Sequence, residues 1–88
     1  MTKSVDQQKA RAMLSLLGVV ERAISADPST GTGAQNLISA RAAITAIARS
    51  RYEPALRVLR QVVDECKDEP CVFLAIQAID LIVNGYPR

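Results

Sequence analysis

Asp80, Cys66 and Cys71 are the residues whose type and position most suggest chemistry. A carboxylate in an apolar segment can act as a general acid or base, and a cysteine thiolate can act as a nucleophile or a metal ligand. The chain of 88 residues contains no histidine, which is the commonest general base. Two cysteines without histidine also cannot complete a structural zinc site within one chain. We therefore predict that the protein is not an enzyme and has no catalytic residue, metal site or cofactor.

The carboxylate of Asp80 lies in the most apolar segment, from Pro70 to Asn84. Gln77, Asp80 and Asn84 follow one another at i, i+3 and i+7, which on a helix gives one narrow polar stripe. We interpret the stripe as facing water. The alternative is a buried polar contact that fixes the helix register or pairs two subunits, with an arginine from another segment as its partner.

The two cysteines flank a predicted corner between two helices. A local disulfide across this corner is geometrically conceivable. We interpret the pair instead as two half-buried thiols in a reducing compartment.

The charges separate into a basic middle and an acidic region after it. From position 41 to 60 there are five arginines and one acid, and from 64 to 80 there are five acids and one lysine. The planar guanidinium of arginine suits recognition of carboxylates and phosphates. The predicted partner-binding residues are therefore Arg49, Arg51, Arg57 and Arg60. Three uses of this region stay open: a solvated face, contact with an acidic protein partner, and contact with nucleic acid. The net charge of +2 is too small to imply nucleic acid by itself.

The elements that must position these residues are all predicted to be helices. Capping-box patterns are found at Ser4–Gln7 and Thr32–Gln35, with the loop-like segment Asp27–Gly33 before the second helix. The third helix begins either after a similar pattern at Ser50–Glu53 or as late as Pro54, since the residue before a proline disfavours helix. A close helix crossing would explain Gly18 inside the first helix, but the sequence identifies no helix that crosses there. The expected helices span about 4–26, 33–49, 53–67 and 70–84, in a single domain of residues 1–88.

Apolar residues recur at helical spacing in each of these segments, and no alternating strand pattern is present. The predicted buried faces are Met13, Leu17, Val20 and Ile24 in the first helix and Leu37, Ala40, Ile44 and Ile47 in the second. The third helix has a heptad-like row, Tyr52, Leu56, Leu59, Val63 and Cys66, and a second row, Ala55, Val58 and Val62. We predict an all-α fold, either a compact four-helix bundle or two stacked helical hairpins.

The last helix is apolar nearly all round and must therefore be covered nearly all round. Two interpretations remain: a central helix of the bundle, or half of a subunit interface. The predicted oligomer or core contacts are Phe73, Ile76, Ile79, Asp80 and Val83.

We expect a small non-catalytic protein–protein interaction module, acting as an adaptor, inhibitor or regulatory subunit and associating with itself. Its expected partner is a protein with an acidic surface, or a second copy in a homo-oligomer, most simply a dimer. The alternative is a nucleic-acid-binding regulator that uses the Arg41–Arg60 basic face. No membrane partner is expected, because the apolar run is shorter than the ~20 residues that span a bilayer. A cytoplasmic location is the default, because Met1–Gln8 is polar and lacks the pattern of a secretory signal.

Overall fold

The computed structural model describes residues 2–85, with side chains from Gln7 onward. Within residues 2–85 the chain forms four α-helices and no strand. They are α1 (Thr2–Ile24), α2 (Gly31–Ser50), α3 (Leu56–Glu65) and α4 (Glu69–Asn84), and a 3-10 turn, η1 (Glu53–Ala55), precedes α3. The prediction of an all-α fold is confirmed.

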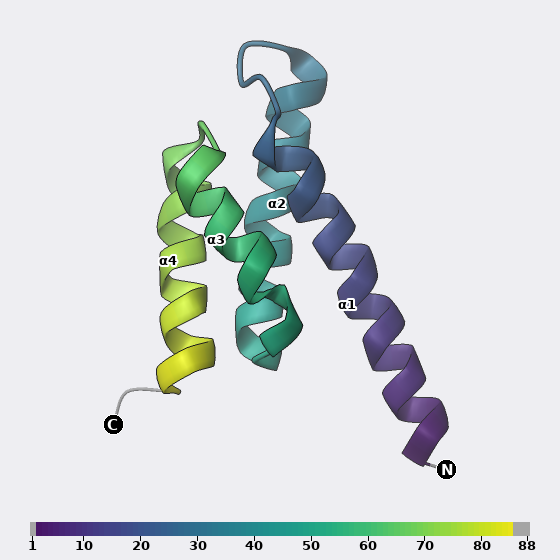
Figure 1. Cartoon of the computed structure of the whole chain (residues 1–88). Coiled ribbons are helices and arrows are strands. Elements are labelled where there is room, and N and C mark those ends of the chain that lie inside the picture. The colour runs from purple at the N-terminus through teal and green to yellow at the C-terminus, as the bar shows by residue number, and fades with distance from the viewer. Residues whose placement is uncertain (1, 86–88) are drawn as a thin grey trace.

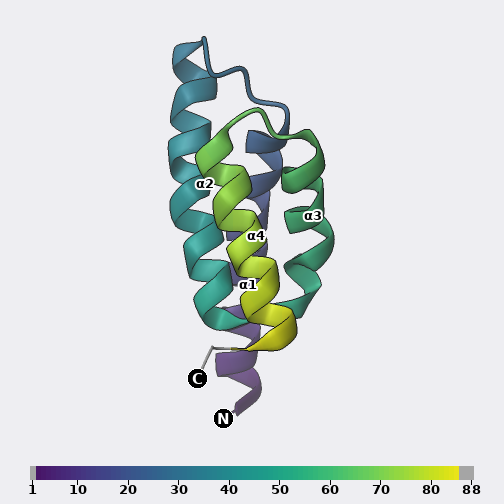
Figure 2. The ribbon, with the colours of Figure 1, turned by 90° about the vertical axis from the view of Figure 1, so that its left-hand side faces the viewer.

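The four helices are arranged as two antiparallel hairpins that stack on each other (Figures 1 and 2). The helix α1 packs against α2, and α3 packs against α4. Between the hairpins, α2 lies beside α4 and α1 lies beside α3. In Figure 2 α4 is in front and α1 is behind, so these two helices occupy opposite corners of the bundle. Both forms of the prediction, a four-helix bundle and stacked hairpins, describe this arrangement.

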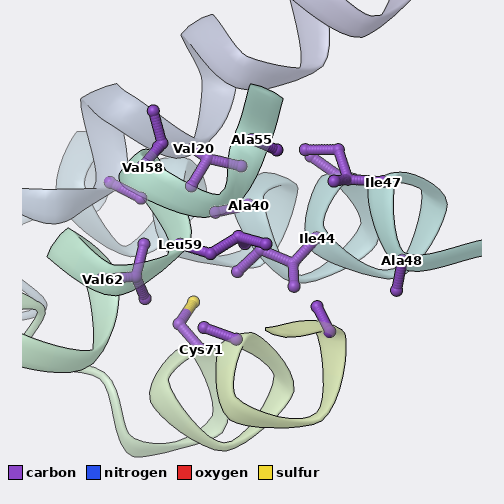
Figure 3. Close-up of a cluster of buried hydrophobic side chains, with 14 of the residues drawn as sticks. Val20, Ala40, Ile44, Ile47, Ala48, Ala55, Val58, Leu59, Val62 and Cys71 are labelled. Atoms are coloured by element: carbon purple, nitrogen blue, oxygen red, sulfur yellow. The ribbon is translucent and has the colours of Figure 1, made fainter. Parts of the chain in front are cut away.

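The core lies between the two hairpins and is built from aliphatic side chains. Figure 3 shows Val20 of α1, residues of α2 and α3, and Cys71 of α4 gathered in one cluster. The predicted face of α2 is buried throughout. In η1 and α3 the buried row is Ala55, Val58, Leu59 and Val62. The other members of the predicted heptad-like row are only half-buried, because they lie at the margin of the buried face and not in its middle.

The start of α2 differs from the predicted capping box. The cap is Thr30, two residues before the predicted Thr32, and its Oγ1 accepts a hydrogen bond from the Gly33 N–H at 2.9 Å. The preceding Asp27 organises the loop, because its Oδ1 accepts bonds from the Ser29 N–H at 2.9 Å and the Ser29 hydroxyl at 2.7 Å. The backbone at Gly33 packs so closely on the Asp27 carbonyl that a Cβ there would overlap it.

Two other helix boundaries also differ from the expectations. The helix α1 begins at Thr2, so Ser4 is inside the helix, and its side chain lies outside the described residues. Ser50 is the last residue of α2, and Arg51 after it adopts the left-handed conformation with φ 50°. The capping box at Ser50 is therefore absent, and the later start of the third helix is correct. Among the described residues, only Nη1 of Arg22 comes within 4 Å of a Cβ built at Gly18, so no close helix crossing explains this glycine.

Candidate interaction site

The outer face of α4 is the most apolar exposed surface among the described residues. Phe73, Ile76 and Val83 are 60%, 49% and 57% exposed. The residues that α4 buries against the bundle are mostly small: Cys71, Ala75 and Ala78, with Ile82. Small residues let α4 approach its neighbours closely, which leaves its larger side chains on the outside. The interpretation of α4 as a central helix is therefore wrong.

A groove runs between α3 and α4 on the outside of their hairpin. It consists of two adjoining hollows that share Ile76. The hollow nearer the α3–α4 corner is lined by Cys66, Lys67, Glu69, Val72, Phe73 and Ile76. The second is lined by Arg60, Val63, Asp64, Ile76 and Ile79. We call these two hollows together the α3–α4 groove, and its floor and α4 side are apolar.

The two sides of the α3–α4 groove differ in charge. The α3 side, including the corner, contributes Arg60 and Lys67 together with Asp64. On α4 the only charged residues are Glu69 and Asp80, and the helix contains no lysine or arginine. The charged residues that line the groove from α3 and the corner are thus mainly basic, whereas the otherwise apolar α4 side contributes only Glu69, with the exposed Asp80 outside the two hollows.

Asp80 belongs to the polar stripe on the outer side of α4. Gln77, Asp80 and Asn84 are all exposed, and the Asn84 amide donates to Asp80 Oδ1 at 2.7 Å. The interpretation that this stripe faces water is confirmed. Asp80 makes no buried contact within the described chain, so it does not fix the register of these four helices.

Another, smaller hollow lies on the other flank of α4, against α2. It is lined by Thr45, Ala48, Arg49, Leu74, Gln77, Ala78 and Leu81. In Figure 2 α2 lies to the left of α4 and α3 lies to the right.

The four predicted arginines do not form one patch. All four are exposed, but Arg49 lines the α2–α4 hollow, whereas Arg60 lines the α3–α4 groove. Arg51 follows the end of α2, with its guanidinium beside Gly85. Arg57 lies one turn before Arg60 on α3. The structure therefore separates Arg49 from Arg57 and Arg60 by the width of α4.

An ion pair that sequence analysis missed joins Arg41 of α2 to Asp68 at the start of α4. The Arg41 Nε–Asp68 Oδ2 distance is 3.1 Å and the Nη2–Oδ1 distance is 3.0 Å. The hydrogen bond from Arg41 holds the pKa of Asp68 below its usual value. Asp68 also caps α4, because Oδ2 accepts from the Cys71 N–H at 3.2 Å. Both charges were visible in the sequence, but no local pattern joins positions so far apart.

The two cysteines are free thiols with separate partners. The half-buried Cys66 thiol donates to the Ala23 carbonyl at 3.7 Å, and the Cys71 thiol donates to the Leu37 carbonyl at 3.5 Å. Burial, together with the nearby Asp68, raises the pKa of Cys71 to about 12. Cys71 is therefore a packing residue, and the described part of the chain contains no cluster of cysteine and acidic residues able to hold a metal ion.

No protein-family model, curated protein or solved structure matches this chain. Its surface must therefore be interpreted from its own residues. Among the described helices, none combines the length and the apolar character needed to cross a bilayer.

Proposed function

We propose that the protein is a non-catalytic protein–protein interaction module and that the α3–α4 groove is its binding surface. The observation that carries this proposal is the exposure of Phe73, Ile76 and Val83 on one helix beside that groove. Large apolar side chains grouped on a surface are typical of protein interfaces, whereas isolated ones are common on any surface. An apolar centre with a charged rim is also the usual composition of an interface.

The charged rim suggests the chemistry of the partner. Arg57 and Arg60 lie on the exposed side of α3, and Arg60 lines the groove itself. An apolar surface flanked by carboxylates would fill the groove and pair with these arginines. The role of an adaptor, inhibitor or regulatory subunit follows from such binding without chemistry. A cytoplasmic site of action belongs to the same proposal and is supported by two free thiols, which persist in a reducing compartment.

A pair of matched variants tests the proposal. Ile76→Asp places a charge in the middle of the groove, and Ile38→Asp places one at a similarly exposed isoleucine on α2. Tagged proteins are used for capture from nuclease-treated lysate of the native host, at moderate salt. The proposal expects the same protein to be captured by wild type and Ile38→Asp, and to be lost with Ile76→Asp. Equal capture by all three would contradict it, provided that circular dichroism shows each variant to be helical.

Nucleic-acid binding stays the alternative, supported by Arg57 and Arg60 one turn apart on an exposed helix. The two functions respond differently to salt. Binding to duplex DNA loses affinity with a slope of about −0.9 in log K per phosphate neutralised. Binding through an apolar groove changes far less. Nuclease-sensitive capture that is lost with Arg57→Glu/Arg60→Glu and retained with Ile76→Asp would favour this alternative.

A further inference from the structure

We infer that the α3–α4 groove is occupied by the α3–α4 groove of a second copy of this chain, with a two-fold axis running along the grooves. This inference rests on the proposed function and names its partner. It depends on three features of the described residues: the shape of the apolar surface, the charges on its two sides, and the packing of the chain's own hairpins.

The apolar surface is complementary to itself. Phe73, Ile76 and Val83 project from α4 beside a hollow whose floor includes Val63 and Ile79. A two-fold axis along the groove places the projecting side chains of each copy over the hollow of the other. A two-fold contact closes after two copies, because the same patch is used on both sides. The remaining large exposed apolar residues, Leu14 on α1 and Ile38 on α2, are single residues on different helices.

The charges favour the same orientation. With the axis along the groove, the basic α3 side of one copy faces the acidic α4 side of the other. Arg60 lines the hollow that holds Ile76 and Ile79, and Asp80 is the next residue along α4. Arg60 is therefore expected to face Asp80 of the second copy. Arg60 has no ion pair within the described chain, and Asp80 is bonded only to Asn84 there.

The opposite orientation is unfavourable. An axis across the groove would place α3 on α3 and α4 on α4. The two α4 helices, whose only charged residues are the acids Glu69 and Asp80, would then face each other. Like charges placed opposite one another across an interface are repulsive.

The packing within the chain gives a precedent for this contact. The inner side of the α3–α4 hairpin is already covered by a hairpin, with α2 lying along α4 and α1 along α3 in the same directions (Figure 1). A second hairpin on the outer side would again be a hairpin packed on a hairpin, but with the facing helices antiparallel, because the axis along the groove sets α3 of one copy on α4 of the other.

The first test measures the oligomeric state of purified full-length protein by sedimentation equilibrium, from about 1 µM to 1 mM. Wild type is expected to reach twice the monomer mass of 9.5 kDa. Ile76→Asp should weaken dimerisation by about 100-fold or more, because each of the two copies places a buried charge in the apolar centre of the interface. Ile38→Asp is the matched control and should dimerise like wild type. A wild type that stays monomeric, or an Ile76→Asp variant that still dimerises normally, would overturn the inference.

The second test reverses the charges on each side of the groove. Arg60→Glu alone and Asp80→Arg alone should each weaken dimerisation by about tenfold, because two rim ion pairs are lost per dimer. A mixture of the two variants should form heterodimers with restored affinity, since each reversed side meets its complement. If Arg60→Glu leaves the wild-type affinity unchanged, the orientation is wrong.

The two proposals fail in different ways. A monomeric protein whose capture of another protein depends on Ile76 would remove the self-association and leave the interaction module standing. A dimer with the expected charge dependence supports both.

Discussion

Arg41 and Asp68 form a two-pronged ion pair that ties the middle of α2 to the first turn of α4, with distances of 3.1 and 3.0 Å. Because Asp68 is also the helix cap, one carboxylate both starts α4 and holds it to the neighbouring hairpin. This contact lies at the end of α4 nearest the corner, beside the proposed binding groove, which Glu69 and Lys67 line.

Replacing Asp68 separates its two roles. Asp68→Ala removes the cap and the ion pair, and the loss of the cap alone should lower the free energy of unfolding by about 1–2 kcal/mol. Asp68→Asn should cost less, because asparagine is an equally good cap. Urea denaturation of the two variants measures the difference. If the two variants lose the same free energy of unfolding, the ion pair contributes more to stability than the cap does.

Stability should fall in acid because of Asp68. Its pKa is lowered in the folded protein, chiefly by the hydrogen bond from Arg41, so it binds fewer protons than in the unfolded chain. The stabilisation is complete above the unfolded pKa of about 3.9 and is lost as the pH falls through the lower folded value. In thermal melts, the melting temperature of Asp68→Asn should therefore fall less steeply than that of the wild type below about pH 4. The pKa of Asp27 is also lowered, chiefly by the hydrogen bond from the Ser29 hydroxyl. Part of the loss of stability in acid should therefore remain in this variant. An unchanged decline would contradict the assignment to Asp68.

Gly33→Ala should be strongly destabilising. The added Cβ would overlap the carbonyl of Asp27, which is backbone and cannot rotate away. Either the loop must shift or the Thr30 cap must break, at a cost of about 2–3 kcal/mol. Guanidinium denaturation measures this cost, and a change below about 0.5 kcal/mol would show that the loop adapts easily.

Gly18→Ala should have the opposite effect. Gly18 lies within α1, and only Arg22 Nη1, at 3.9 Å, is near the position of a new Cβ. Alanine should therefore add up to about 1 kcal/mol of stability through its helix propensity. A loss of stability in the same denaturation assay would contradict the open surroundings of Gly18.

The two thiols should react at different rates with a thiol reagent. Cys71 is buried and its pKa is raised to about 12, so little thiolate forms at pH 8. Cys66 is half-buried at the edge of the groove and should be modified first. Mass spectrometry of the native protein should show a single label on Cys66, with Cys66→Ser as the unlabelled control. Equal labelling of both positions would contradict the burial of Cys71.

The helices could be predicted from the sequence because their apolar residues recur at helical spacing. Leu37, Ala40, Ile44 and Ile47 are buried as expected, since a single stripe on α2 leaves no ambiguity. The cap of α2 was misplaced because Thr30 and Thr32 both precede a helical pattern. The choice of Thr30 over Thr32 as the cap depends on the packing of Gly33 on Asp27, which the sequence does not show.

The binding surface could be predicted only in part. The sequence of α4 shows that it has too many apolar residues for one buried face, but it does not show which face is buried. The sequence left open whether the large residues contact the core or a second subunit, and the close approach of α2 and α3 places the small residues Cys71, Ala75 and Ala78 inside. The arginines were treated as one set because they are near in sequence. The turn at Arg51 places Arg49 and Arg60 on opposite sides of α4.

The short connections of the two hairpins have a consequence for folding kinetics. Only residues 25–30 separate α1 from α2, and only residues 66–68 separate α3 from α4. Each hairpin can therefore form through contacts that are local in sequence, and helical proteins with low contact order fold on the order of microseconds to milliseconds. The docking of one hairpin on the other, completed by Arg41 and Asp68, is then the step that sets the folding rate. Variants at this ion pair should slow folding, whereas variants on the outer face of α4 should leave the folding rate of the monomer unchanged.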